Sequence, residues 1–149
     1  VKGQMLSLQG PINKLNKILF GPKTYLVPRE DGLIVVGATV EKNAKFYKGN
    51  TPQGIKELEI GIKSLFPEAV FWPQMEHWWG FRPATQDLKP ILGESKIKDL
   101  FIATGHYRNG VLFSAITSNI MYKFIHNEHL MESEQKFINN FSPNRFSTI

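Results

Sequence analysis

The chain has 149 residues, 42% of them hydrophobic, and a formal net charge of +5. A chain of this length can bury one good hydrophobic core. It has no cysteine, which excludes disulfides, thiolate catalysis and sulfur-ligated metals and is consistent with a reducing cytoplasm. No stretch approaches the roughly 18 apolar residues of a membrane span, and the N-terminus lacks the pattern of a signal peptide. We therefore expect a cytoplasmic protein with no membrane partner.

The basic residues are spread along the chain, and none of them gather in a dense run. This distribution favours a solvated basic surface, because a nucleic-acid interface concentrates Lys and Arg on one face. We expect no nucleic-acid partner. The spacing is visible among the lysines of the first 56 residues, for example Lys14, Lys17, Lys23, Lys42, Lys45, Lys48 and Lys56.

The first half of the chain predicts three strands and a helix. Residues 3–10, "GQMLSLQG", form a short strand, and the apolar runs "KTYLVP" and "LIVVGATV" flank "REDG". The Asp-Gly pair is a strong turn signal, so the two runs predict a β-hairpin. Thr51 is suited to cap a helix whose first residue is Pro52 and which ends before Pro67. Its apolar face holds Ile55, Leu58, Ile62 and Leu65.

The second half predicts two strands separated by a turn-rich connection. Residues 75–83, "MEHWWGFRP", form a strand with Trp78, Gly80 and Arg82 on one face. "DLKPILG" is the connection, and "LFIAT" is a short buried strand.

Two helices complete the expected fold. The first runs from Gly110 to about His126, and a short second one docks before a frayed end, "SPNRFSTI". The fold class is therefore α+β: a largely antiparallel sheet with a helix on it, followed by a terminal strand-helix unit. The apolar sides of the two helices hold Leu112, Ala115, Ile116, Ile120 and Phe124, and then Phe137, Ile138 and Phe141.

The stretch "ATGHYRNGVLFSAIT" joins the last strand to the long helix and has the features of an anion site. The helix that follows Asn109 has no acid in its first turn, so its free N–H groups and positive dipole end face the junction. Arg108 adds a full positive charge there, and such a junction suits an anion or a group that becomes anionic. The alternative is a capped helix with an exposed arginine.

A second arginine, Arg82, lies in an apolar strand and is locked by the proline that follows it. Such an arginine either pairs with a buried acid, for which Asp87 is the local candidate, or grips a ligand carboxylate with two parallel hydrogen bonds. Tyr25 is either a half-buried strand residue or a ligand contact. His106 is either a turn residue or a cofactor contact, whereas His77 is read as a packed strand histidine. No cluster suggests a metal, and no Ser/His/Asp or Cys/His set is present.

These stretches resemble the C-terminal part of the flavin-dependent D-amino-acid oxidase family, in particular its glycine oxidase branch, which serves thiamine biosynthesis. The resemblance is carried by "VKGQML", "YLVPREDGLIVVGATVE", "WWGFRPATQDLKPILG" and "LFIATGHYRNGVLFSAIT", in that order and with family-like gaps. It covers nearly the whole chain apart from about the last fifteen residues.

The resemblance implies a domain organisation. Residues 1–98 would be the C-terminal part of a substrate-binding domain, residues 99–128 the last strand and helix of an FAD-binding domain, and residues 129–149 a C-terminal tail. The G-x-G-x-x-G dinucleotide loop of the family is absent from this sequence. We therefore expect a missing N-terminal FAD domain as a partner, and we expect the chain alone to be an inactive fragment without FAD and with a tendency to form a homodimer.

The resemblance also implies the site. Arg82 matches the arginine that binds the substrate carboxylate, Arg108 a second residue at the substrate, and Tyr25 the tyrosine that closes over it. No residue matches a catalytic acid or base, and no metal is implied. The stretch that contacts the flavin in this family corresponds here to His106, Tyr107, Arg108, Asn109, Gly110, Val111 and Leu112.

The activity that the resemblance implies is oxidative deamination of a small amino acid, with FAD as cofactor and hydrogen peroxide as a product. Lys23 and Val40 occupy positions where close relatives can carry other side chains near the substrate, so glycine, sarcosine and other small amino acids all stay open as the amine. The competing hypothesis is a non-catalytic, basic, anion-binding α+β module, which the missing dinucleotide loop would favour.

Overall fold

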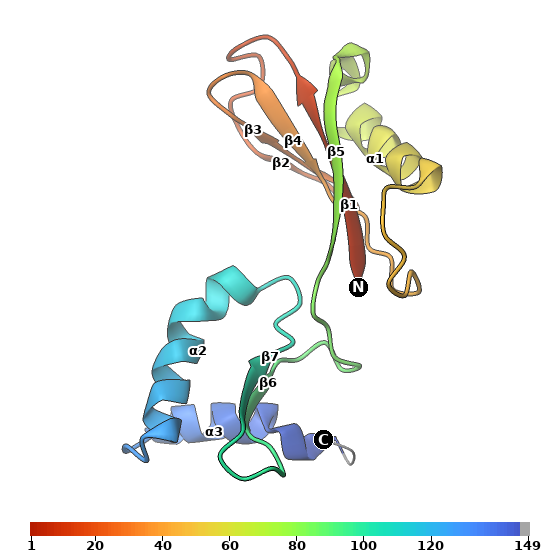
Figure 1. Ribbon diagram of the computed structural model, residues 1–149. Helices are drawn as coiled ribbons and strands as arrows, with labels where there is room; N and C mark the ends of the chain where they lie inside the picture. Colours follow the sequence, from red (N-terminus) through yellow and green to blue (C-terminus); the bar gives the residue numbers. More distant parts are fainter. Residues whose placement is uncertain (147–149) are drawn as a thin grey trace. The chain divides into compact units, whose positions relative to one another are not determined.

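The computed structural model describes residues 1–146 and has two compact units (Figure 1). The first is Val1–Phe81, and the second begins at Arg82. The described residues form an antiparallel sheet, a smaller two-stranded sheet and helices. The predicted α+β class with a largely antiparallel sheet is confirmed.

The first unit is built on a five-stranded antiparallel sheet with the order β2-β3-β4-β1-β5. Its bounds are β1 Lys2–Gln9, β2 Leu19–Phe20, β3 Tyr25–Pro28, β4 Leu33–Gly37 and β5 Gln74–Phe81. The predicted hairpin is confirmed: β3 pairs with β4, and the Arg29 N–H donates to the Leu33 carbonyl at 2.7 Å to close it. The two-residue strand β2 carries too little pattern to be predicted from sequence.

One helix, α1 (Pro52–Leu65), covers one face of this sheet. The Thr51 hydroxyl caps it by accepting a hydrogen bond from the Gly54 N–H at 3.1 Å, as predicted. The short 3₁₀ helix η1 (Pro67–Phe71) follows at once, because a proline cannot continue the α-helical ladder.

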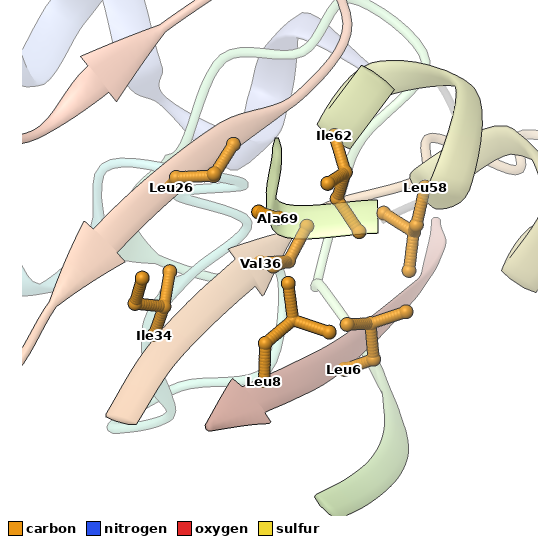
Figure 2. Packing of buried hydrophobic residues seen from close by; sticks show 8 residues of the cluster. All are labelled: Leu6, Leu8, Leu26, Ile34, Val36, Leu58, Ile62 and Ala69. Carbon is orange, nitrogen blue, oxygen red and sulfur yellow. The ribbon is translucent and has the colours of Figure 1, made fainter. Parts of the chain in front are cut away.

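The core of the first unit lies between the sheet and α1 (Figure 2). Side chains alternate across a strand, so Leu6 and Leu8 of β1 point to the same face and meet the helix. Leu58 and Ile62 come down from α1 onto them, four residues apart and therefore on one side of the helix. The fully buried cluster consists of Leu6, Leu8, Leu26, Ile34, Val36, Leu58, Ile62 and Ala69.

The second unit contains the antiparallel pair β6 (Ile91–Glu94) and β7 (Phe101–Thr104) and the helices α2 (Gly110–Ile125) and α3 (Glu132–Phe141). The prediction that "DLKPILG" is only a connection is wrong, because its last residues form β6. The prediction of a buried strand at "LFIAT" is also wrong: β7 is half-buried at Phe101 and exposed at its last two residues. Leu92 of β6 belongs to the buried cluster of this unit, whereas β7 packs against that cluster through Phe101, which is only partly buried.

Both helices of the second unit are confirmed. The predicted apolar side of α2 is confirmed at Ile120 and Phe124, which pack in the core, and is wrong for the first turns of the helix. Its buried residues are Thr117, Ile120 and Met121, whereas Leu112 is 75% and Ile116 48% exposed. This helix is apolar on several sides, so periodicity alone could not select the one that packs. The small core of this unit consists of Leu92, Ile120, Met121 and Ile138.

The end of the chain is ordered further than predicted. Pro143–Arg145 form a 3₁₀ turn, η2, and Pro143 is buried, so the prediction of a frayed end is wrong for these residues. The remainder of that prediction, residues 147–149, lies outside the described residues.

Candidate functional site

The junction between β7 and α2 is a tight turn whose backbone requires glycine at one position. Gly105 is buried and has φ +78°, and a Cβ built on it would lie 2.9 Å from the Thr85 methyl group. Both the conformation and the close approach therefore make any other residue strained at this position. Tyr107 has φ +53°, so the chain reverses sharply just before Arg108.

The Arg82 segment lies beside this junction. The Tyr107 N–H donates to the Pro83 carbonyl at 2.9 Å, and Ala84 forms an antiparallel bridge with His106. Strand β5 ends at Phe81, so the placement of Arg82 inside a strand is wrong. Pro83 has no N–H to donate, and the ladder therefore stops just before it. The structure thus joins the two predicted arginine segments by backbone pairing.

The start of α2 is open to an electron-rich group. Asn109 makes no side-chain cap, the first turn contains no acid, and Arg108 precedes it with an exposed side chain. The first N–H groups of the helix and its positive dipole end therefore face outward. Val111 and Leu112 are 92% and 75% exposed and give the same end an apolar surface.

His106 contacts the helix that follows it. Its Nε2 lies 3.1 Å from the Oγ1 of Thr117, a buried residue about two turns into α2. The imidazole therefore fastens the junction to α2. A contact with a cofactor stays a prediction for His106.

Tyr25 lies in the first unit and is half-buried in β3. Its ring stacks on Phe20 at 6.1 Å between centroids, and its hydroxyl lies against Gly37, where a Cβ would be only 2.5 Å away. Its role at a substrate stays a prediction. The prediction of a packed His77 is wrong, since this residue is exposed and its Nε2 lies 2.7 Å from the Gln74 side-chain oxygen.

Asp87, the local acid considered for Arg82, is bound by Arg145. The Arg145 Nε donates to Asp87 Oδ2 at 2.9 Å and Nη2 donates to Oδ1 at 3.2 Å. These hydrogen bonds hold the pKa of the Asp87 carboxyl well below its usual range. The sequence analysis missed Arg145, because a polar end after a short helix gives no local sign of a partner 58 residues away.

The described residues also contain a cavity, but no metal-binding group and no membrane-spanning helix. A cavity of about 360 Å³ between the β2–β3 turn and α1 is lined by Lys23, one of the two residues predicted to lie near the substrate, but by none of Tyr25, Arg82 and Arg108. Within residues 1–146, no group of three or more His, Cys, Asp or Glu is arranged to hold a metal ion. Over the same residues, every helix is too short or too polar to cross a bilayer.

The sequence matches the family model described as "FAD dependent oxidoreductase" over residues 1–123. It is 44% identical to the "Bifunctional protein ThiO/ThiG" of Synechocystis sp., over 99% of this chain and 23% of that protein. It is 32% identical to the "Glycine oxidase" of Bacillus subtilis, over 87% of this chain and 35% of that protein. The chain therefore spans only about a quarter to a third of the length of these relatives.

The fold agrees with this result. The glycine oxidase of Geobacillus kaustophilus superposes with a TM-score of 0.78 at 29% identity, covering 87% of this chain and 35% of that one. An iminodiacetate oxidase from Chelativorans sp. shares the fold with a TM-score of 0.81, at 24% identity. The resemblance to the glycine oxidases is confirmed.

The residues at the junction fit the family's cofactor. An uncapped helix start, an adjacent guanidinium and two exposed apolar side chains suit the electron-rich edge of a flat ring system. His106, Tyr107, Arg108 and Asn109 form the turn that leads to this helix start. The chain belongs to the FAD-dependent oxidoreductase family.

Proposed function

We propose that this chain supplies the substrate side of an FAD-dependent oxidase that converts glycine or a related small amino acid to its imine. The imine is then hydrolysed to the keto acid and ammonia, and dioxygen is reduced to hydrogen peroxide. The observation that carries the proposal is the backbone pairing of the Arg82 segment with the His106–Tyr107 turn, beside Arg108 and an uncapped helix.

Arg82 is the residue proposed to bind the substrate carboxylate. Its guanidinium presents parallel N–H donors that match the two carboxylate oxygens, which fixes the orientation of the amino acid as well as its charge. The segment that carries it is held by the Pro83 carbonyl and by the bridge at Ala84. Arg108 is proposed as the second group at the substrate, and Tyr25 as the side chain that closes over it.

The start of α2 is proposed to hold the flavin. When bound, FAD supplies the acceptor for the hydride that leaves the α-carbon of the amine. The proposed contacts stabilise negative charge on the ring through N–H groups, the helix dipole and Arg108. They are His106, Tyr107, Arg108, Asn109, Gly110, Val111 and Leu112.

The proposal assigns no catalytic acid or base to this chain. Its contribution is orientation and electrostatics: Arg82 positions the amino acid, and the junction stabilises charge where it develops. This division is supported by the two arginine segments, which are joined by backbone pairing beside the uncapped start of α2.

The wider setting is part of the same proposal. Residues 1–98 act in substrate binding, residues 99–128 complete an FAD domain whose dinucleotide loop lies on an N-terminal partner segment, and residues 129–149 form the tail. We expect the oxidase to serve thiamine biosynthesis in the cytoplasm. The 149-residue chain by itself is expected to be colourless, inactive and prone to form a homodimer.

Replacement of Arg82 tests the proposal. In the FAD-loaded oxidase, Arg82→Ala is expected to cost roughly 2–5 kcal/mol of substrate binding, and so to raise KM for glycine tens- to thousands-fold. The flavin spectrum should be retained, because the cofactor contacts proposed here lie elsewhere. Peroxide release measured against glycine concentration gives KM. Arg29→Ala, at an exposed arginine in the β3–β4 turn, is the matched control. An unchanged KM in Arg82→Ala would rule out this assignment.

A further inference from the structure

Arg145 is the most completely bonded charged side chain described near the candidate site. A guanidinium has five N–H donors, and all five are used. Nε and Nη2 donate to the two Asp87 oxygens, and Nη2 also donates to the Lys89 carbonyl at 2.9 Å. Nη1 donates to the carbonyls of Phe141 and Ser142 at 2.8 and 3.1 Å. We call this set of contacts the Arg145 clamp.

The Arg145 clamp joins the end of α3 to the turn that follows Arg82. Asp87 also accepts hydrogen bonds from the Thr85 hydroxyl at 2.8 Å and from the Lys89 N–H at 3.1 Å. The same Thr85 Oγ1 lies 2.7 Å from the Lys89 carbonyl oxygen, so the single hydroxyl proton is shared between the two acceptors. The turn from Thr85 to Lys89 is therefore closed on itself around one carboxylate, and Arg145 fastens that carboxylate to the C-terminal segment.

The same turn touches the junction before α2. The Thr85 methyl group lies against Gly105, so close that no Cβ would fit there. Just before Thr85, Pro83 accepts the Tyr107 N–H and Ala84 bridges His106. A displacement of the turn would therefore change the backbone positions of both Arg82 and Arg108, because the turn is connected to the first along the chain and contacts the segment that carries the second.

We propose that Arg145 is a positioning residue for the candidate site: through Asp87 and Thr85 it holds the Arg82 segment and the His106–Arg108 turn in register. This inference rests on the proposed function for the role of the two arginines. Arg145 lies beyond residue 123, where the match to the family model ends. The tail thus completes a site whose other members lie inside the matched region.

The clamp requires arginine in particular. Lysine has the same charge, but its ammonium lacks the planar fork that reaches a carboxylate and three carbonyls at once. The guanidinium also stacks over the Phe146 ring, with Cζ at 4.4 Å from the ring centroid, and its side chain is only 18% exposed. Arg145→Lys is therefore expected to behave like Arg145→Gln.

Amide hydrogen exchange of the 149-residue chain tests the clamp without any activity. In Arg145→Gln and in Asp87→Asn, the Tyr107 and Asn109 amides are expected to exchange roughly tenfold faster or more, because their turn opens more often. The Ile120 and Met121 amides in α2 should keep their protection, which shows that the unit remains folded. Lys136→Gln, which removes an exposed ion pair of α3, is the control and should change none of these rates.

The double variant decides whether Arg145 acts through Asp87. Residues that share one interaction are not additive, so Arg145→Gln with Asp87→Asn should exchange no faster than the quicker single variant. Unchanged rates at Tyr107 and Asn109 in the single variants, or effects that multiply in the double variant, would overturn the proposal. If Arg145→Gln loses the fold of the whole unit, the nearly isosteric Asp87→Asn still decides it.

A carboxylate probe separates this inference from the proposed function. Glycolate is titrated into the chain while the side-chain Nε–H signals of Arg82 and Arg108 are followed by NMR. Binding that is several-fold weaker in Arg145→Gln than in the wild type is expected, and equal affinity would overturn the positioning role. If the wild-type signals do not move, this chain without its FAD domain does not hold the carboxylate, and the exchange rates decide the clamp while KM of the FAD-loaded Arg82→Ala oxidase decides the substrate assignment.

Discussion

Each of the two units of the molecule is stabilised internally by a different kind of interaction. In Val1–Phe81, eight buried apolar residues from three strands, α1 and η1 form one continuous core. In the unit that begins at Arg82, the buried apolar cluster has only four members, and charged contacts fasten the elements around it. The predicted site arginines belong to this second unit.

Each unit is therefore sensitive to a different kind of change. Burial of apolar surface depends little on pH, whereas a hydrogen-bonded carboxylate contributes only while it is ionised. The second unit should therefore respond to acid and to single charge changes, and the first to changes in side-chain volume. The three tryptophans, Trp72, Trp78 and Trp79, all lie in the first unit, so their fluorescence reports on that unit alone.

Loss of core volume in the first unit should have the largest effect. Leu58→Ala removes a fully buried side chain and is expected to reduce the free energy of unfolding by about 2–5 kcal/mol. Urea titration followed by tryptophan fluorescence measures it. Ile60→Ala, on the same helix but 62% exposed, is the control and should stay within about 0.5 kcal/mol of the wild type. Equal losses in both variants would contradict the core described for this unit.

Replacement of a glycine in α1 by alanine should have the next largest effect, and it should lower the free energy of unfolding, although this change usually raises it in a helix. In a helix, Gly→Ala usually stabilises by roughly 0.5–1 kcal/mol. At Gly61, however, a Cβ would lie 2.0 Å from the Thr24 hydroxyl oxygen, so Gly61→Ala is expected to destabilise by about 1–3 kcal/mol. The same urea titration checks it, with the exposed Ser64→Ala as the control. A stabilised Gly61→Ala would mean that α1 does not approach Thr24 this closely.

Acid should lower the stability of the second unit more than that of the first. Hydrogen bonds from Arg145 and from Lys123 lower the pKa of the Asp87 and Glu134 carboxyls, respectively, from ordinary values of 3.8 and 4.5. Because these folded-state pKa values are depressed, the stabilisation is complete above the ordinary values and is lost as the pH falls below them. NMR signals of the second unit, followed on heating between about pH 3 and 7, should disappear at progressively lower temperature in acid.

Neutral variants provide the control for this acid sensitivity. Asp87→Asn and Glu134→Gln remove the titrating groups, so the double variant should be less stable at neutral pH and should depend less on pH. The wild type and the double variant should then converge at low pH. An acid dependence in the double variant as steep as in the wild type would assign the sensitivity to other groups.

The smallest effect is expected at a charge pair on the surface. Lys136 and Glu132 form an i,i+4 pair in α3 with N···O 2.6 Å, but their side chains are 71% and 84% exposed. Water and salt screen such pairs, so Lys136→Ala should change stability by only about 0.2–0.5 kcal/mol. Heating with NMR detection of α3 checks it. If Lys136→Ala lowered stability as much as Arg145→Gln does in the same measurement, the Arg145 clamp would contribute no more to stability than an exposed surface ion pair.

Local patterns were enough to predict much of the fold. The Thr51-Pro52 start of α1, its apolar face and the Asp-Gly turn between β3 and β4 all depend on residues within a few positions of one another. The prediction of an anion site at the turn before α2 also rests on contiguous residues, namely its glycines, Arg108 and the acid-free helix start. The family resemblance rested on these contiguous stretches too.

Burial in the second unit could not be predicted in this way. The apolar residues of α2 occupy several sides of the helix, so only the packing of β6 and α3 selects Ile120 and Met121 for the core and leaves Leu112 exposed. In β7 the apolar run predicted burial, but Phe101 is only partly buried against the core and the last two residues of the strand are exposed. Hydrophobicity indicates that a residue can be buried, and the neighbouring elements decide whether it is.

The β3–β4 hairpin, the cap of α1 and most of the longer elements follow from residues that are neighbours along the chain, whereas β2, β6 and η2 do not. Only the tertiary structure decided what Arg145 does. Its carboxylate partner, Asp87, lies 58 residues earlier, and neither position carries a local signal of the other. The Arg145 guanidinium can donate to all five acceptors only when the Thr85–Lys89 turn, the end of α3 and the tail lie next to one another, and only the folded chain brings these three segments together.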